Sequence, residues 1–94
     1  MVAKAGGMRA LPAVSRVPIT VCIRALLCDY EIDVAGERAG LTVHELGRAW
    51  RARYGTLLST GLFYRLSESL LIEQLPTRRC AVSGGHLHAW VPVQ

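Results

Sequence analysis

Membrane-length apolar runs, paired cysteines and lysine are missing or scarce in this chain of 94 residues. No apolar run reaches the roughly 18 residues that a membrane-spanning helix needs, so we expect no such helix. No continuous apolar stretch follows the basic residues Lys4, Arg9 and Arg16, which argues against a secretory signal. Three cysteines cannot all pair, which argues against a disulfide framework and favours a reducing compartment. We therefore expect an intracellular, cytoplasmic protein.

The composition is that of one small, basic, folded domain. Hydrophobic residues make up 51% of the chain and charged residues 19%, a mixture that supports a packed core. The length is enough for one domain and too short for two. The formal net charge is +4, and Lys4 is the only lysine, so arginine supplies nearly all of the positive charge. The arginine guanidinium can donate two parallel hydrogen bonds to a phosphate or a base edge, which lysine cannot, so the preference for arginine favours nucleic-acid binding. A GC-rich genome would give the same preference for arginine over lysine.

Charge is distributed unevenly along the chain. Residues 1–24 carry a net charge of +4, residues 25–47 carry −4, and residues 48–94 carry +4. This order suggests a polarised surface. The alternative is that the surface of a small protein is patchy by chance.

Periodicity and punctuation define an arm, a first helix and a loop. Residues 1–15 are rich in Ala and Gly without a clear period, so we predict a flexible basic arm, followed by a domain over residues 16–94. A helix is predicted from Pro18, because apolar residues then recur three or four positions apart as far as Tyr30. The acidic stretch 31–40 contains two glycines and is predicted to be a loop.

The sharpest local signal is a capping box that opens a second helix. The Thr42 side chain can accept from the amide of Glu45, and Glu45 can reach back to the amide of Thr42. Apolar and aromatic residues follow on one stripe as far as Tyr54, and Gly55 then supplies a helix stop. Leu41, just before the cap, can act as a hydrophobic staple or as a one-rung strand.

A third helix and a hairpin complete the predicted order. Ser59 or Thr60 can cap the helix, which is predicted to end near Gln74, before Pro76. Residues 77–94 are predicted to form a two-stranded hairpin. One core is expected to contain Leu26, Leu46, Trp50, Phe63, Leu66 and Leu87.

The hairpin is predicted to turn at Gly84 and Gly85, the two central positions of a tight turn. This register places Arg79 opposite Trp90 and gives the hairpin two faces. The apolar face holds Cys80, Val82, Leu87, Ala89 and Val91, and the other face holds Arg79, Ser83, His86, His88 and Trp90. Trp90 then either packs against the arm, the third helix or a second copy, or stacks with arginine on a face that meets a nucleic-acid backbone.

This order of helix, short strand, two helices and hairpin resembles the winged helix-turn-helix family. The segment from Gly40 to Leu46 resembles the "G-L-T-x-x-E-L" that opens the second helix of many bacterial members, and Leu62 to Leu66 resembles the start of their recognition helix. Arg78, Arg79, the Gly-Gly turn and the closing residues 89–92 resemble a wing. We therefore expect an α+β fold, a three-helix winged helix-turn-helix with a C-terminal two-stranded β-hairpin wing.

The resemblance implies a small, sequence-selective DNA-binding transcriptional regulator. Its third helix would enter the major groove, while the wing and the second helix would hold phosphates. The implied DNA-binding residues are Thr60, Gly61, Tyr64 and Arg65 on the third helix, Arg48 and Arg51 on the second, and Arg78, Arg79 and His86 on the wing. The alternative is a winged helix that binds protein and not DNA, through the acidic loop or the face with Trp90. A homodimer would use the arm, the first helix or the hairpin edge.

Three features depart from the family pattern. The connection from Tyr54 to Leu62 is longer than the usual turn of the motif, and Arg48, Arg51 and Arg53 make the second helix unusually basic. Glu68 lies on the outward side of the third helix, where a carboxylate repels phosphate but could accept from cytosine. The sequence therefore leaves open which surface would read DNA.

No residue pattern points to catalysis, a metal or a cofactor. Cys80, His86 and His88 are close in the hairpin, but the predicted register puts Cys80 on the face opposite both histidines. Cys22 and Cys28 are six positions apart on a helix, so they diverge. The chain has no Cys-x-x-Cys spacing, phosphate loop, dinucleotide fingerprint or nucleophile motif. We therefore expect neither an enzyme nor a metal or cofactor site.

Overall fold

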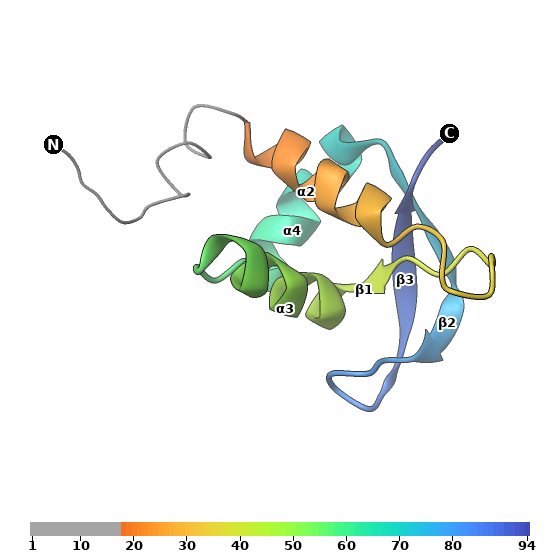
Figure 1. The fold of residues 1–94 in the computed structure, drawn as a ribbon. Helices are drawn as coiled ribbons and strands as arrows, with labels where there is room; N and C mark the ends of the chain where they lie inside the picture. Colours follow the sequence, from red (N-terminus) through yellow and green to blue (C-terminus); the bar gives the residue numbers. More distant parts are fainter. Residues whose placement is uncertain (1–17) are drawn as a thin grey trace, which may run out of the picture.

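The computed structural model describes residues 18–94, and the arm predicted for residues 1–15 lies outside them. Their elements are helix α2 (Ile19–Asp29), strand β1 (Leu41–Thr42), helix α3 (Val43–Tyr54), helix α4 (Thr60–Leu66), the 3₁₀ helix η2 (Ser67–Leu70), and strands β2 (Ile72–Arg79) and β3 (His86–Pro92). The strands form one antiparallel sheet in the order β1-β3-β2. This part of the chain confirms the predicted α+β class (Figure 1). None of its helices is long and apolar enough to cross a membrane.

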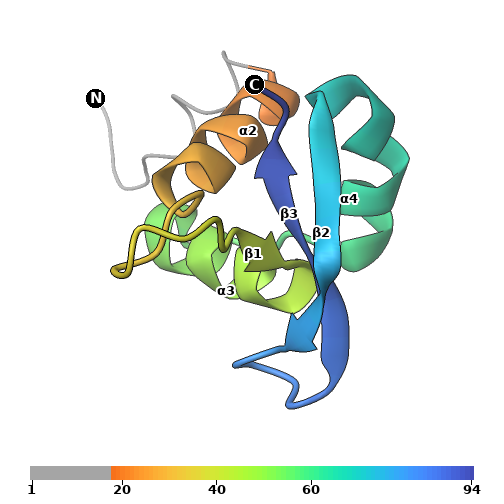
Figure 2. The ribbon, with the colours of Figure 1, turned by 90° about the vertical axis from the view of Figure 1, so that its right-hand side faces the viewer.

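The three helices share one buried core with β1. The core residues are Cys22, Ile23, Leu26, Leu27, Leu41, Val43, Leu46, Trp50, Leu58, Phe63 and Leu70. Leu66 and Trp90 are partly buried and pack against this cluster. Tyr30, predicted to belong to the first helix, lies just after α2 and is 45% exposed. In both views the loop between β2 and β3 projects beyond α3 and α4 (Figure 2).

The starts of α2 and α3, and the end of α3, lie where the sequence predicts them. Pro18 is the N-cap of α2. The capping box of α3 is confirmed: Thr42 Oγ1 accepts from the Glu45 amide at 3.3 Å, and Glu45 Oε1 accepts from the Thr42 amide at 3.0 Å. Gly55 ends α3 with a φ of 73°, a left-handed conformation that glycine adopts at little cost. Leu41 forms a strand with Thr42, so the strand interpretation of this residue is confirmed.

Helix α4 is shorter than predicted. Ser59 is its N-cap, and the side chain accepts the amide hydrogen of the residue three positions on, at 3.0 Å. The predicted end near Gln74 is wrong, because the α-helix stops at Leu66 and gives way to η2. Leu71 then adopts a left-handed φ of 52°, which ends the helical turns, and β2 begins at Ile72. The spacing of apolar residues continues through η2, so periodicity did not reveal where the α-helix stops.

The predicted two-residue turn of the hairpin is also wrong. Arg79 pairs with His86 and not with Trp90, so the connection is the longer loop 80–85. The amide of Cys80 closes this loop by donating to the carbonyl of Gly85 at 2.7 Å. The partner of Arg79 moves by four positions, an even number, so Arg79 keeps its predicted side of the sheet.

Cys80 and Val82 therefore do not lie on a strand. Both belong to the β2–β3 loop, where Cys80 is buried and Val82 is 43% exposed. The register also shifts between Gln74 and Thr77, next to Pro76, which has no amide hydrogen to donate. Because Cys80 is not part of a strand, pairing in the sheet does not explain its burial, and a contact with another part of the fold must do so.

The two sides of β3 have different surroundings. Trp90 packs edge-on against Phe63 of α4 with ring centroids 5.3 Å apart, which confirms that this tryptophan packs against the third helix. Because side chains alternate along a strand, Ala89 and Val91 lie on the opposite side, where they are 1% and 0% exposed. Leu87 lies on that side too and is not part of the helical core, contrary to the prediction.

Candidate nucleic-acid interface

Helix α4 exposes the residues predicted to read DNA and buries Phe63, which lies among them. The exposed residues are Thr60, Gly61, Tyr64 and Arg65. Phe63 is fully buried in the core and fixes which side of the helix faces inward. The outward side of α4 therefore offers a hydroxyl, a phenol and a guanidinium group.

Helix α3 carries a second exposed stripe. His44, Arg48 and Arg51 recur at helical spacing and are all exposed. Leu46 and Trp50, which are buried, hold the other side of this helix in the core. The two arginines predicted to hold phosphates thus share one solvent-facing stripe.

The hairpin presents Arg79 and His86 on the side of the sheet where α4 packs. The two residues are directly opposite each other across β2 and β3, and both are exposed. Strand alternation places His86 on the same side of β3 as Trp90. Trp90 also contacts Tyr64 of α4, with ring centroids 6.4 Å apart. The hairpin and α4 therefore offer groups on the same side of the sheet.

The arginines of residues 18–94 divide into two groups. Arg24, Arg38, Arg53 and Arg78 each bind carboxylates or backbone carbonyls. The guanidinium groups of Arg48, Arg51, Arg65 and Arg79 form no salt bridge or hydrogen bond with any residue of this part of the chain. The guanidinium groups without a partner in residues 18–94 therefore lie on α3, α4 and the end of β2.

Most acidic residues without an arginine partner in residues 18–94 lie away from α3, α4 and the end of β2. Asp33 and Glu37 belong to the loop between α2 and β1, where Asp33 accepts the Glu37 amide at 2.9 Å. This loop also exposes two apolar residues, Ile32 at 54% and Val34 at 109%. Glu68, predicted to lie on the third helix, is exposed on the short helix η2, just after α4. The acidic loop is thus a separate surface from the arginines.

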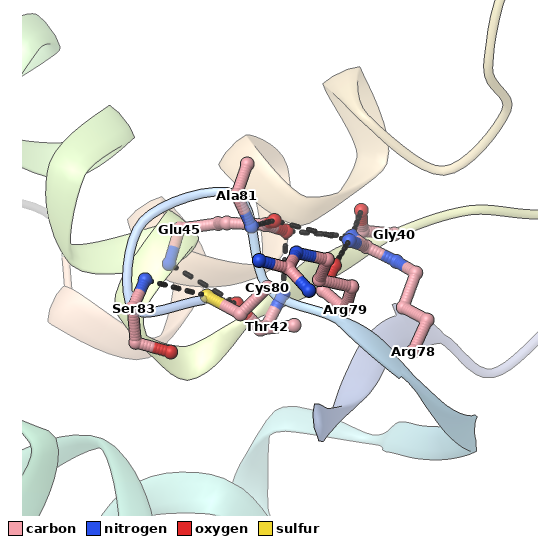
Figure 3. A network of polar contacts seen from close by, with 8 residues as sticks. All are labelled: Gly40, Thr42, Glu45, Arg78, Arg79, Cys80, Ala81 and Ser83. Carbon is pink, nitrogen blue, oxygen red and sulfur yellow. Dashed lines mark hydrogen bonds and ion pairs between the residues drawn. The ribbon is translucent and has the colours of Figure 1, made fainter. Parts of the chain in front are cut away.

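Arg78, which was predicted to hold a phosphate, has internal partners. Its guanidinium donates to both carboxylate oxygens of Glu45, at 2.6 and 3.0 Å, and to the carbonyl of Gly40 at 3.1 Å (Figure 3). Strand alternation explains the difference from Arg79, because neighbouring residues of β2 point to opposite sides of the sheet. Among the described residues, Arg78 is the one arginine of the predicted DNA-binding set whose guanidinium is bound to a carboxylate.

Glu45 collects hydrogen bonds from three parts of the chain. Besides Arg78 and its own cap at Thr42, it accepts the amide hydrogen of Ala81 in the β2–β3 loop at 2.8 Å. Burial alone would raise the pKa of Glu45, but the hydrogen bonds from Arg78, Ala81 and Thr42 outweigh it and lower this pKa from 4.5 to about 2. The carboxylate is therefore charged over the whole physiological range.

Cys80 is the buried end of the same network. Its Sγ lies 3.0 Å from Thr42 Oγ1 and 3.4 Å from the amide nitrogen of Ser83 (Figure 3). Burial raises the pKa of this thiol, whereas hydrogen bonds from Ser83, Thr42 and Val82 lower it, and the balance brings the pKa from 9.0 to about 7. The contact with Thr42 explains why Cys80 is buried in a loop.

Sequence reasoning identified Glu45 only as a helix cap. Its role in holding the hairpin depends on a contact with residues 33 and 36 positions further on, and no local pattern signals such a pairing. Among the described residues, no group of three or more His, Cys, Asp or Glu is arranged to hold a metal ion. Comparison with known proteins gives no match to any family model, curated protein or solved structure.

Proposed function

We propose that this chain is a winged-helix module that binds duplex DNA and acts as a small transcriptional regulator. The order α2-β1-α3-α4-β2-β3, with β3 between β1 and β2, supports the winged-helix interpretation. In this proposal α4 is the reading helix and the β2–β3 hairpin is the wing.

One observation carries the proposal: the arginines that have no partner within residues 18–94 belong to the predicted DNA-binding set. Arg48 and Arg51 lie on α3, Arg65 on α4 and Arg79 on β2. An arginine that binds no carboxylate or carbonyl of its own chain is available to phosphate oxygens, and phosphate contacts dominate DNA affinity. The acidic residues that could oppose DNA are mostly paired or lie in the α2–β1 loop, with Glu68 as the exception.

Different elements would do different work at the DNA. Arg65 lies on the exposed side of α4, where a guanidinium can donate two hydrogen bonds to guanine in the major groove. Thr60, Gly61 and Tyr64 would lie against the same groove. Arg48, Arg51, Arg79 and His86 would position the module on phosphates.

A matched pair of variants on α3 tests the location of the interface. Arg51→Ala and Arg53→Ala remove the same charge from the same helix, but Arg53 is paired with Asp29 at 2.7 Å and Arg51 has no partner in the described residues. We expect Arg51→Ala to weaken binding to random duplex DNA and to lower the salt slope by about one unit, while Arg53→Ala leaves both nearly unchanged. Equal losses in the two variants would show that only net charge matters.

A second pair separates reading from positioning. Arg65→Ala should weaken a preferred site more than random DNA, because a bidentate contact to guanine discriminates by about 1–3 kcal/mol. Arg79→Ala should weaken both kinds of DNA alike. The preferred site is first selected from a random duplex library with the wild-type chain. If Arg65→Ala lowers both affinities by the same factor, α4 is not the reading helix.

The alternative function, a protein-interaction module, has its own supporting observation. The α2–β1 loop is held in shape by the bridge between Ile32 and Arg38 and by the side chain of Asp33, yet it leaves Val34 fully exposed. An ordered loop with an apolar tip and acidic flanks suits a basic protein partner. Failure of the wild type to bind DNA at about 50 mM salt would favour this function.

A further inference from the structure

We infer that Glu45 is a positioning residue of the DNA interface: it fastens the β2–β3 loop to the N-terminus of α3 and so sets where the wing meets DNA. The inference rests on the proposed function. It assigns no DNA contact to Glu45 itself, which acts through Arg78 and the backbone of the loop.

The fastening uses both oxygens of one carboxylate. Oε1 accepts from the Thr42 amide at 3.0 Å and from Arg78 at 2.6 Å. Oε2 accepts from Arg78 at 3.0 Å and from the Ala81 amide at 2.8 Å. The side chain of Glu45 is only 10% exposed, so water competes weakly for these donors. One side chain thus joins the start of α3, the end of β2 and the first residues of the loop (Figure 3).

Two neighbouring contacts also hold the end of β2 and the start of the β2–β3 loop against the N-terminus of α3; we call this place the joint. Arg78 donates to the carbonyl of Gly40 at 3.1 Å, just before β1. Cys80 lies against Thr42 Oγ1 at 3.0 Å, on the cap that Glu45 completes. The hairpin end projects past the helices, and these contacts join it to the body of the domain. The backbone on both sides of Arg79 is therefore fixed, which limits where its guanidinium can reach.

Removing the charge of Glu45 should change DNA affinity in one direction if only electrostatics matters, and in the other direction if Glu45 positions the wing. Removing a carboxylate from a DNA-binding protein reduces repulsion of phosphate and should strengthen binding. If Glu45 positions the wing, removing its charge should weaken binding, because the wing arginine no longer meets the backbone in a fixed place. The sign of the change therefore distinguishes the two explanations.

Glu45→Gln in the chain of 94 residues is the test, with Glu68→Gln as the matched control. Glutamine still serves in a capping box, so α3 keeps its start, but it cannot bind Arg78 as an ion pair. Glu68 is exposed and has no hydrogen-bond or ion-pair partner within residues 18–94, so its variant makes the same charge change without touching the loop. We expect Glu45→Gln to weaken binding to random duplex DNA about fivefold and to lower the salt slope by about one unit. Glu68→Gln should bind as well as the wild type or better.

The buried thiols provide a readout that does not depend on DNA. Cys80 and Cys22 are 1% and 7% exposed, whereas Cys28 is exposed and is replaced by alanine in all variants compared. With a thiol reagent, Glu45→Gln should make Cys80 react at least about tenfold faster than in the parent, because the loop opens, while Cys22 stays protected. If both thiols react together, Glu45 stabilises the whole fold and does not specifically position the loop.

Arg78→Lys gives a second variant with no change of charge. Lysine cannot form the two-pronged contact with Glu45, so we expect the same exposure of Cys80 and the same loss of DNA affinity. Combining it with Glu45→Gln should add little, because both changes open one joint. If Arg78→Lys keeps full affinity and a protected Cys80, the inference is overturned.

The outcomes separate the inference from the proposed function. If the wild type does not bind DNA, the proposed function is wrong and the positioning role is wrong with it, whatever the reactivity of the Cys80 thiol. A wild type that binds DNA, together with a Glu45→Gln variant that binds equally well or keeps Cys80 protected, overturns the positioning role alone.

Discussion

Glu45 makes the stability of the fold depend on pH, because folding lowers the pKa of its carboxylate. Its pKa is about 2 in the folded protein, against an ordinary value of 4.5. A pKa lowered by folding stabilises the protein above the ordinary value, and the stabilisation is lost as the pH falls from about 5 towards 2. The full shift corresponds to about 3 kcal/mol. The side chain of the partner Arg78 is 38% exposed, so solvent screens the ion pair. We therefore expect Glu45 to contribute about 1–2 kcal/mol to the free energy of unfolding at pH 7.

Urea unfolding of the wild type and of Glu45→Gln at pH 7 and pH 3 measures this contribution. At pH 7 the variant should be less stable by about 1–2 kcal/mol, and at pH 3 the difference should shrink to less than half, because the wild-type carboxylate has lost most of its advantage. Other acidic groups titrate in both proteins and cancel in the difference. Glu68→Gln should stay close to the wild type at both pH values. A difference between wild type and Glu45→Gln that is the same at pH 7 and pH 3 would refute the reasoning.

Three further changes test the packing, and urea melts measure each. Phe63→Ala should cost about 3–5 kcal/mol, close to the whole stability of so small a domain, and a loss below about 1 kcal/mol would contradict its place in the core. Thr42→Ala should cost about 1 kcal/mol, because it removes the cap and the contact with Cys80, and an unchanged midpoint would show that the cap contributes nothing. Gly40→Ala should destabilise by more than about 1 kcal/mol. Its φ is 61° and a Cβ would lie 2.3 Å from the Trp90 carbonyl oxygen. Gly61→Ala, in open space on α4, is the control and should be neutral or stabilising.

The helices could be predicted because their signals are local. The capping box at Thr42, the stop at Gly55 and the cap at Ser59 each involve residues within one helical turn, and the structure contains all three. The end of α4 could not be predicted in this way. It depends on the left-handed backbone of Leu71 and on strand pairing with residues near the C-terminus, which local apolar spacing does not encode.

The hairpin register was missed because a distant residue helps to set it. A Gly-Gly pair favours a two-residue turn when a hairpin stands alone. Here Glu45 binds the amide of Ala81, and Thr42 contacts Cys80. Both contacts need residues 80 and 81 to lie against α3 and not in a strand, so the connection is the longer loop 80–85. The side of the sheet that Arg79 occupies was still predicted correctly, because the error in register was an even number of residues.

The candidate site was predicted in part. Sequence alone named Arg48, Arg51, Arg65 and Arg79, and the structure leaves all four exposed without a partner among the described residues. The same reasoning also named Arg78, which is bound to Glu45. A run of two arginines cannot show which of them points inward, because this depends on the pairing register and on an acid from another element.

The most direct test of the account is the affinity of the wild-type chain for random duplex DNA as a function of salt. If Arg48, Arg51 and Arg79, the arginines assigned to phosphates, bind them, the logarithm of the binding constant should fall against the logarithm of salt concentration with a slope of about −3. A variant with these three arginines changed to alanine should lose most of this slope, whereas Arg53→Ala should keep it. A wild type that shows no binding at about 50 mM salt, or a triple variant with an unchanged slope, would contradict the claim that this surface binds DNA.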